Sequence, residues 1–486
     1  MMLVLGLVVI AFGLRLWVLA SLPLIETDGV RYVTLARQFQ ESGSLFDPLF
    51  HPFYPLCIAF FQPLLGEYEF TGRMISAVFG AALVFPAYAM AHALLGRPAA
   101  ILATFLLAIH PGMVLSSAAV LSESAYIFLL VLGVWVSWKG IATSRYVLLV
   151  VAGLIFGFAY LARPEGALYL LGLLVLIVII GVRFDCFREM APWAGGALMA
   201  FLVVAGPYLL YLRQTLGYWT LSGKILHNLV QDIGQAPAPG QTDVELLLSH
   251  GGSVFRRIME NVFLFEKYAL PDLFPGFLVL FLLPGLLTRV RDVKWGTHEG
   301  LLLGTALPPF VALVFHVESR VFLPVLPFLL PIVASGILAT ATWLARDRPV
   351  KRWSIGLVCV VVVALLPYTF RPIFRPDTGA MLYRQASQWI AITQAKDVAV
   401  MDRKPFIAFY SGRRFVPLGN VSPEELVPAA RRTGARLVVL DSRVFGDRPL
   451  LIPLLYGPVP IGLEVLREFD AGMDGRLRIL RVQERD

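Results

Sequence analysis

The sequence predicts a polytopic α-helical membrane protein with a small α/β domain at its C-terminal end. Of its 486 residues, 58% are hydrophobic and only 15% are charged, whereas a soluble domain has about 25% charged residues. About eleven runs are apolar over the roughly 20 residues that a helix needs to cross a bilayer. The last part of the chain instead mixes charged residues with short β-type runs.

These runs divide the chain into a membrane part, 1–370, and a soluble tail, 371–486. The first run has no basic start and no small-residue cleavage site, so we expect it to remain as the first helix. Within that run Arg15 lies among apolar neighbours, and we expect it to have a buried acidic partner. The predicted spans are 2–22, 72–95, 98–116, 119–138, 146–161, 166–182, 191–212, 273–288, 300–316, 321–343 and 354–370.

The charges of the short loops predict a cytoplasmic N-terminus. In that orientation five short connections place twelve Lys and Arg residues inside, as the positive-inside rule expects. These connections are 96–98, 139–145, 183–189, 289–294 and 346–352. The outside of a plasma (inner) membrane then receives the loops 23–71 and 213–271 and the tail. We therefore expect functional side chains on the extracytoplasmic side.

Composition also excludes several function classes. The formal charge is +8, but the positive residues form no continuous basic run. We therefore expect the protein to contact membrane lipids rather than nucleic acid. The three cysteines, Cys57, Cys186 and Cys359, form no CxxC pair and receive no role.

The stretch 244–265 in the second outer loop has apolar residues at helical spacing and is expected to lie along the membrane interface.

The tail predicts a strand–helix–strand unit. Residues 398–401 and 436–440 are β-type runs, and between them Ser422-Pro423-Glu424-Glu425 has the residues that begin a helix. The tail contains neither GxGxxG nor a P-loop, so nothing in it indicates nucleotide binding. We expect a lid or a platform for an acceptor.

The first outer loop carries the most informative residues. Asp28 directly precedes a stretch in which Tyr32, Leu35, Ala36 and Phe39 fall on one helical face. An aspartate there is either a helix cap or a catalytic carboxylate, and spacing alone favours the cap. A second short element, 51–56, follows, and two short helices between the first two spans are unusual for a transporter loop.

The order of motifs resembles glycosyltransferase superfamily C (GT-C), in the branch of the protein O-mannosyltransferases and the bacterial aminoarabinose transferases that modify lipid A. After Asp28 and its helix, the motifs are Pro52-Phe53-Tyr54-Pro55-Leu56, 72–77, Leu121-Ser122-Glu123-Ser124, 160–166 and 318–324. The resemblance implies a polyprenyl-phosphate sugar as donor, an acceptor on the outer face (a protein, a lipid or a glycan), and inversion at the anomeric carbon. It also implies that Asp28 is the catalytic base.

The resemblance leaves the use of a metal open. Many members carry a second acid after the aspartate, but this chain has Gly29. We therefore expect no cofactor other than a divalent metal, whose involvement is undecided.

The chemistry implied by the resemblance needs few residues. A carboxylate must take the acceptor's proton, and fixed cations must compensate the phosphate as it leaves. Arg320, Arg163 and Arg73 are the candidate phosphate-binding cations, each with an ion pair as its alternative role. The candidates for contacting the donor, holding a metal or orienting another group are Glu123, Glu165, Glu318, His51 and His316.

Three other functions stay open at this stage. A transporter or flippase of lipid-linked sugars would show repeats and matching broken helices, and the sequence has no such symmetry. A polysaccharide ligase or polymerase usually has its catalytic loop late in the chain. A membrane scaffold that presents the tail would not need Asp28.

Overall fold

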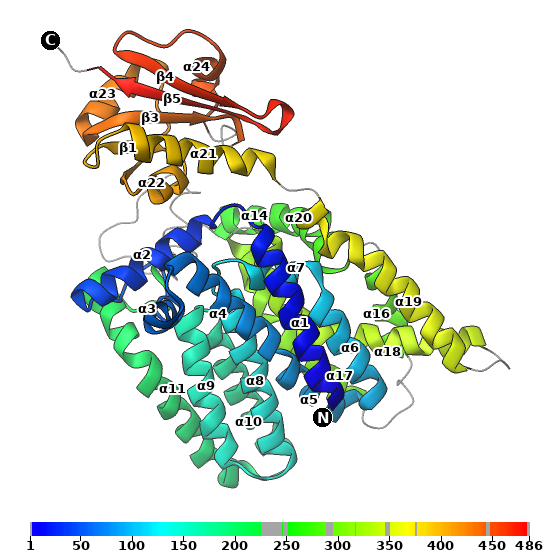
Figure 1. Ribbon diagram of the computed structural model, residues 1–486. Coiled ribbons are helices and arrows are strands. Elements are labelled where there is room, and N and C mark those ends of the chain that lie inside the picture. The colour runs from blue at the N-terminus through cyan, green and yellow to red at the C-terminus, as the bar shows by residue number, and fades with distance from the viewer. Residues whose placement is uncertain are drawn as a thin grey trace. The chain divides into compact units, whose positions relative to one another are not determined.

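The computed structural model describes residues 2–224, 245, 251–275, 277–287, 295–315, 317–345, 350–374, 377–443 and 448–483 (Figure 1). It divides into two compact units. The membrane unit comprises residues 1–20 and 32–370, and the C-terminal unit comprises residues 371–486 together with residues 21–31. Sequence analysis assigns residues 21–31 to the membrane part, and the structure groups them with the tail instead.

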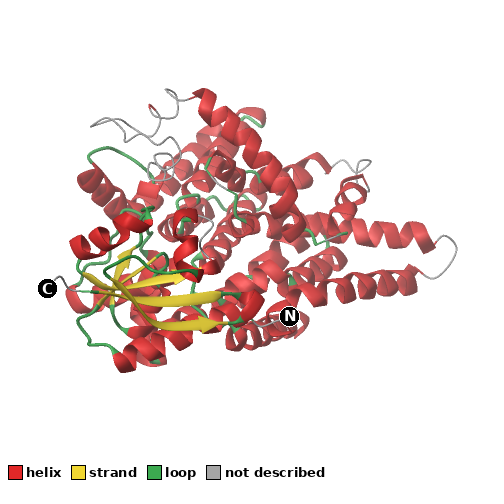
Figure 2. Ribbon diagram, turned by 90° about the horizontal axis from the view of Figure 1, so that it is seen from above, coloured by secondary structure: helices red, strands yellow, loops and turns green. Residues whose placement is uncertain are grey.

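The membrane unit is helical in the part of the chain that the structure describes (Figure 2). Its first half contains α1 (Met2–Ser21), α2 (Thr27–Ser42, which begins in the other unit), α3 (Phe53–Leu65), α4 (Tyr68–Ala82), α5 (Val84–Leu95), α6 (Arg97–Ile109), α7 (Pro111–Ala118), α8 (Glu123–Ala142), α9 (Val147–Ala162), α10 (Gly166–Arg183) and α11 (Phe187–Leu216). Its second half contains α14 (Gly251–Leu264), the π-helix η1 (Phe265–Ala269), α15 (Leu270–Leu273), η2 (Leu278–Phe281), α16 (Leu282–Leu287), α17 (Trp295–Ala306), η3 (Pro308–Val314), η4 (Ser319–Val325), α18 (Leu326–Ala345) and α19 (Val350–Thr369).

The predicted spans coincide with helices, but their number is not confirmed. By length and composition, seven helices of the described residues can cross a membrane, and nine if two bent pairs each count as one span. Two further predicted spans correspond to the shorter apolar helices Val147–Ala162 and Gly300–Val314. At about 1.5 Å per residue, the 16 residues of α9 reach only about 24 Å, less than the roughly 30 Å of a hydrocarbon core.

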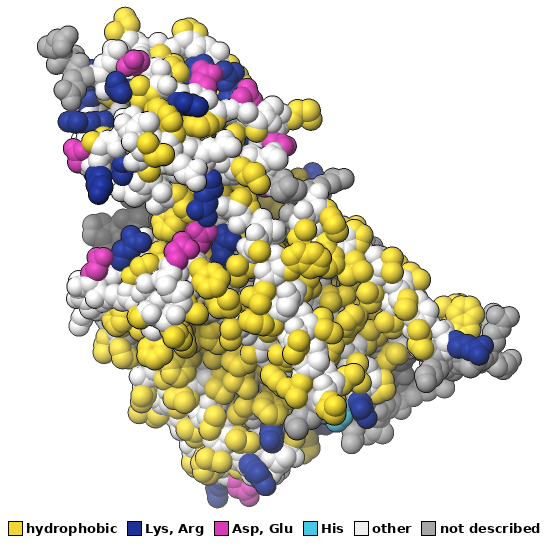
Figure 3. Space-filling view, in the orientation of Figure 1, with side chains coloured by type: hydrophobic (Ala, Val, Ile, Leu, Met, Phe, Trp, Pro, Cys, Tyr) yellow, Lys and Arg dark blue, Asp and Glu magenta, His cyan; other side chains and the backbone are white. Residues whose placement is uncertain are grey.

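The surface of the membrane unit suits a lipid environment. Large apolar side chains are exposed along its helices, among them Val175, Ile179 and Val182 on α10. Figure 3 shows such side chains covering the helical part of the molecule. The predicted interfacial stretch 244–265 is described mainly as α14; residues 244 and 246–250 lie outside the described residues.

The prediction of an acidic partner for Arg15 is wrong. The Arg15 side chain is buried, and its Nη1 donates to the carbonyl oxygens of Ala11 (2.9 Å) and Ala108 (3.1 Å); the described residues include no acidic partner for it. α6 ends at Ile109 before Pro111, and the chain bends by 51° into α7. This break leaves carbonyl groups that no residue of α6 can satisfy. Thr369 Oγ1 donates to the carbonyl of Ile109 in the same way.

The C-terminal unit is an α/β domain with one five-stranded sheet, in the order β2-β1-β3-β5-β4. β1 and β3 lie where strands are predicted, and α23 begins as predicted, with Ser422 and Glu425 forming a capping box around Pro423. The strands are β1 (Ala399–Asp402), β2 (Arg414–Pro417), β3 (Ala435–Asp441), β4 (Leu463–Asp470) and β5 (Arg476–Val482). The helices are α20 (Arg371–Phe374), α21 (Thr378–Thr393), α22 (Phe406–Ser411), α23 (Pro423–Thr433), η6 (Pro449–Leu451), α24 (Ile452–Tyr456) and η7 (Gly472–Asp474).

The central strands β1, β3 and β5 are buried on both faces of the sheet, whereas the edge strands β2 and β4 are mostly exposed. β2, β1 and β3 are parallel, whereas β5 runs antiparallel to both of its neighbours. Residues of α21 and α22 pack on one face and residues of α23 and α24 on the other. Parallel strands that are covered on both faces of a sheet have continuous apolar sequences. Residues 437–440 of β3 are such a sequence.

Asp402 should make the C-terminal unit less stable as the pH rises. It ends β1, its side chain is buried, and burial raises the pKa of its carboxyl to about 7. The unfolded chain releases this proton near pH 4. The folded state therefore loses stability from about pH 4 upward through pH 7, by at most about 4 kcal/mol. Asp402→Asn should remove this loss, so that amide hydrogen exchange in residues 398–416 is slower in the variant than in the wild type at pH 8.

The comparison at each pH uses the full-length protein in detergent. Asp397→Asn, which changes an exposed carboxylate five residues earlier, is the matched control. Equal exchange rates in Asp402→Asn and wild type at pH 8 would contradict the assignment.

Candidate active site

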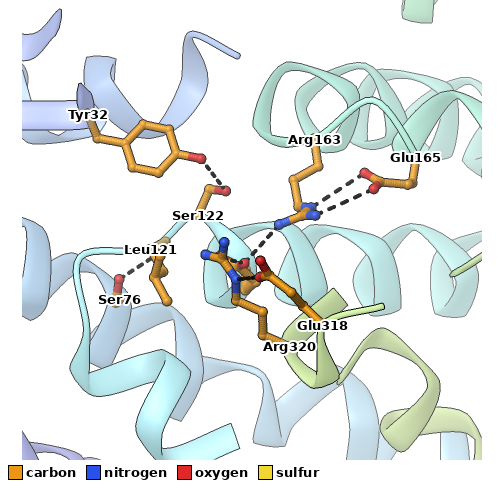
Figure 4. A network of polar contacts seen from close by, with 9 residues as sticks. Tyr32, Ser76, Leu121, Ser122, Arg163, Glu165, Glu318 and Arg320 are labelled. Carbon is orange, nitrogen blue, oxygen red and sulfur yellow. Dashed lines mark hydrogen bonds and ion pairs between the residues drawn. The ribbon is translucent and has the colours of Figure 1, made fainter. Parts of the chain in front are cut away.

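The ends of three elements of the membrane unit bring together a cluster of charged side chains. Glu123 is the first residue of α8, Arg163 follows α9, and Arg320 belongs to η4. Arg163 Nη1 lies 2.9 Å from Glu123 Oε1, and Arg320 Nη1 lies 3.5 Å from the same oxygen. Figure 4 shows the two arginines approaching from different elements. Glu123 is almost fully buried, so both guanidinium groups compensate a carboxylate withdrawn from water.

The turn between α9 and α10 positions Arg163 and Glu165. Pro164 disfavours helical geometry in the residue before it, and Arg163 is extended (φ −156°, ψ 143°), which ends α9. The chain then turns at once into α10. A Cβ on Gly166 would lie 2.4 Å from the backbone nitrogen of Tyr160, so only glycine fits this turn. Arg163 Nε consequently lies 3.4 Å from Glu165 Oε2.

Arg163 is held between two carboxylates. Burial alone would lower the pKa of its guanidinium, but Glu165 and Glu123 raise that pKa well above its ordinary value. Burial likewise would raise the pKa of the Glu165 carboxyl, and Arg163 lowers it below its ordinary value. Both groups are therefore charged at neutral pH, and Arg163 is already compensated.

Arg320 is more readily available to a ligand. Its Nε donates to Glu318 Oε2 at 2.6 Å, and this pair is partly in solvent, with side-chain exposures of 33% for Arg320 and 46% for Glu318. Solvent-exposed ion pairs contribute only about 0–1 kcal/mol. The Arg320–Glu318 pair by itself therefore holds the Arg320 side chain only weakly.

A hydrogen-bonded framework fixes the start of α8. Tyr32 of α2 contacts Ser122 Oγ at 3.0 Å. Tyr54 of α3 and Ser76 of α4 lie 2.7 Å apart through their hydroxyl groups, and Ser76 donates to the carbonyl of Leu121. Sequence analysis quotes the motifs that contain these residues but assigns Ser76 and Ser122 no role. Residues of three motifs earlier in the chain thus fix the position of Glu123 through these hydrogen bonds.

Several buried polar atoms near the cluster have no hydrogen-bond partner among the described residues. They are Glu123 Oε2, Ser124 Oγ, Tyr126 OH and His51 Nε2. Buried polar groups in folded proteins are nearly always paired with protein, water or ligand atoms, so these four atoms are candidates for contacts with a bound molecule. Sequence reasoning missed Tyr126, although it lies three residues after Glu123 and hence on the same face of α8.

His51 lies in the loop before α3 and is almost fully buried. Its Nδ1 lies 2.7 Å from the carbonyl oxygen of Tyr160. Burial lowers the pKa of its imidazole to about 3, so the ring is neutral at physiological pH.

The other predicted site residues lie elsewhere or have other partners. Arg73 pairs with Glu69 at 2.6 Å and donates to the carbonyl of Leu19, so its charge is already compensated. Asp28 lies in the first turn of α2, which begins at Thr27, and it falls in the segment grouped with the C-terminal unit. One helical turn separates it from Tyr32. His316 lies outside the described residues.

Among the described residues, no three His, Cys, Asp or Glu side chains lie close enough together to hold a metal ion. The cations within reach of Glu123 are guanidinium groups.

Comparisons with known proteins agree with this architecture. Residues 48–211 match the family model for dolichyl-phosphate-mannose-protein mannosyltransferase, a range that includes His51, Glu123 and Arg163. The structure of ArnT from Cupriavidus metallidurans bound to undecaprenyl phosphate is similar, with a TM-score of 0.62 and 15% identity over 99% of this chain and 98% of ArnT. The chain has the GT-C fold.

Further structures agree with this result. The apo state of the same ArnT gives a TM-score of 0.60 and 16% identity over 98% of both chains. The Archaeoglobus fulgidus oligosaccharyltransferase in complex with Zn and sulfate gives 0.60 and 14% identity over 90% of this chain and 68% of that one. No curated protein sequence matches the chain. The family model covers residues 48–211 only, and the solved structures share the fold of this chain at 14–16% identity. Its apolar helices make it an integral membrane protein.

Proposed function

We propose that this GT-C protein is an inverting glycosyltransferase that moves a sugar from a polyprenyl-phosphate carrier to an acceptor at the outer face of the membrane. The observation that carries the proposal is the cluster of Glu123, Arg163 and Arg320, built from three element ends in a GT-C fold. An anion site at the edge of an apolar helical unit suits a phosphate whose carrier lies in the lipid. ArnT, which has the same fold, has been solved with undecaprenyl phosphate.

Arg320 is the proposed phosphate ligand. Arg163 and Arg320 face three carboxylates, those of Glu123, Glu165 and Glu318. In these contacts the carboxylates outnumber the guanidinium groups, so we propose that a phosphate displaces a carboxylate from Arg320 when it binds. The exposed Glu318 is the one that leaves most easily. Arg163 then keeps Glu123 in place rather than binding the phosphate itself.

Asp28 is the proposed base. The acceptor's hydroxyl oxygen attacks the anomeric carbon, the bond from that carbon to the phosphate oxygen breaks, and the carboxylate of Asp28 takes the hydroxyl proton. The polyprenyl phosphate leaves with the bonding electrons, and Arg320 compensates its charge. A single displacement inverts the anomeric centre. The loop charges favour a cytoplasmic N-terminus, which assigns this reaction to the outer face.

The lipids that co-purify with the protein test the proposal. Mass spectrometry of wild-type protein should find a polyprenyl phosphate, with or without a sugar, and Arg320→Ala should lose it. Bulk phospholipid alone in both samples, together with no binding of added decaprenyl phosphate, would contradict the proposal and favour a transporter or a scaffold.

Chelation should leave transfer largely unchanged. The described residues include no cluster of three His, Cys, Asp or Glu side chains, and the guanidinium group of Arg320 can compensate the phosphate. Activity in excess EDTA should therefore stay within about twofold of the untreated enzyme, since no step of the proposed reaction uses an ion. A complete loss that Mg²⁺ or Mn²⁺ reverses would contradict this expectation.

A further inference from the structure

His51 has one ring nitrogen that the proposed reaction does not use. The ring is held through the other nitrogen, Nδ1, which lies 2.7 Å from the Tyr160 carbonyl oxygen. In a continuing helix the backbone N–H four residues later would bond that oxygen, but residue 164 is proline and has no N–H. His51 therefore satisfies a carbonyl group that Pro164 leaves open.

This contact fixes the tautomer. A carbonyl oxygen only accepts hydrogen bonds, so Nδ1 must carry the hydrogen and Nε2 must present a lone pair. Nε2 is buried and has no partner among the described residues. Because burial lowers the pKa of the ring to about 3, Nε2 stays an acceptor at physiological pH.

The loop before α3 is held firmly around His51. Asp47 Oδ1 accepts hydrogen bonds from the backbone N–H groups of Leu49 and Phe50, and Tyr208 OH donates to the Asp47 carbonyl oxygen. The rings of Tyr160 and Tyr208 pack edge-on against the imidazole at 5.1 and 4.9 Å. A ring held by one hydrogen bond and two aromatic contacts keeps Nε2 in one direction.

His51 adjoins the charged cluster. Glu165, Lys224 and Arg163 all act electrostatically on its imidazole. The same two cluster residues, Glu165 and Arg163, also act on the Tyr126 phenol, whose buried hydroxyl has no partner among the described residues. Two buried polar atoms without a hydrogen-bond partner among the described residues, His51 Nε2 and Tyr126 OH, therefore belong to residues within electrostatic reach of Arg163 and Glu165.

We propose that His51 Nε2 accepts a hydrogen bond from a hydroxyl group of the donor's sugar and so helps to select that sugar. The proposal rests on the function proposed above. An ionised phosphate offers only acceptor oxygens, which a neutral acceptor cannot bind. A sugar offers hydroxyl donors, and the sugar of the donor is bonded directly to the phosphate. A buried acceptor left unpaired by the wrong sugar is an effective means of discrimination.

Two substitutions separate the roles of the two nitrogens. In His51→Asn the amide nitrogen takes the place of Nδ1 and can still donate to Tyr160, but no acceptor remains at Nε2. In His51→Gln the amide oxygen takes the place of Nε2. The full-length variants are compared with wild type for binding of decaprenyl phosphate and of decaprenyl phosphates that carry mannose, glucose or galactose.

We expect wild type to bind at least one glycosylated lipid more tightly than decaprenyl phosphate. His51→Asn should bind that lipid about five- to tenfold more weakly and decaprenyl phosphate equally well, and His51→Gln should recover part of the loss. An equal loss for decaprenyl phosphate would overturn the inference, because His51 would then serve the phosphate or the fold. Unchanged donor binding with a raised KM for the acceptor would overturn it too, as would a wild type for which no sugar adds affinity. Failure of wild type to bind any of these lipids would overturn the proposed function itself.

Discussion

Asp28→Asn should abolish sugar transfer while donor binding stays close to that of wild type. Asparagine keeps the shape of aspartate and can still contribute a side-chain oxygen in the first turn of α2, but it cannot take a proton from the acceptor. General base catalysis contributes about 10²–10⁴-fold, so kcat should fall by roughly that factor with little change in the Kd for decaprenyl phosphate.

The matched control is Glu41→Gln, which removes an exposed carboxylate from the same helix. It should transfer sugar at the wild-type rate. The alternative role of Asp28, a carboxylate that favours the helix N-terminus, would contribute about 0.5–2 kcal/mol of stability. A variant that loses thermal stability but keeps its kcat would therefore show that Asp28 stabilises α2 and is not the base.

The two roles need not exclude each other. Asp28 lies one turn before Tyr32 on α2, and the Tyr32 hydroxyl contacts Ser122 beside Glu123. A carboxylate in the first turn of a helix can stabilise that helix and still take a proton from a ligand. Measuring kcat and thermal stability on the same sample separates the contributions.

The fold class could be predicted from the sequence because the signals are local. Apolar runs of the required length mark the spans whatever their neighbours are, and the capping residues at Ser422 and Glu425 fix the start of α23 by contacts within one turn. The number of spans is harder to predict from the sequence, because α9 and the helix at Gly300–Val314 are apolar but short. For such helices, the length rather than the hydrophobicity determines whether the helix can cross the bilayer.

The partners of the charged residues could not be predicted, because they are distant in the chain. Glu123 binds Arg163, 40 residues later, and Arg320, almost 200 residues later. Arg73 has a nearer acid, Glu69, one helical turn before it. Arg15 shows the same limit, since its backbone acceptor at Ala108 exists only because α6 breaks before Pro111.

Arg320→Ala should weaken donor binding and turnover together. If its guanidinium binds the donor's phosphate in the ground state and in the transition state, its removal leaves a buried anion with one cation fewer. The loss of such a preorganised group is about 10²-fold or more in kcat/KM. The Kd for decaprenyl phosphate should rise at least about tenfold, since hydrogen bonds to charged groups contribute about 1.5–3 kcal/mol.

Glu318→Gln distinguishes this role from a structural ion pair. Glu318 holds Arg320 Nε at 2.6 Å. If the pair only stabilises the start of η4, replacing either partner should have the same effect. If Arg320 must leave Glu318 to bind phosphate, removing the charge of Glu318 should preserve or tighten the binding of decaprenyl phosphate, whereas Arg320→Ala weakens it. Arg256→Ala, which breaks an exposed pair with Glu260 on α14, controls for the loss of a surface charge. Opposite effects of the two substitutions at the same ion pair would assign Arg320 to the ligand, and equal losses would assign it to the fold.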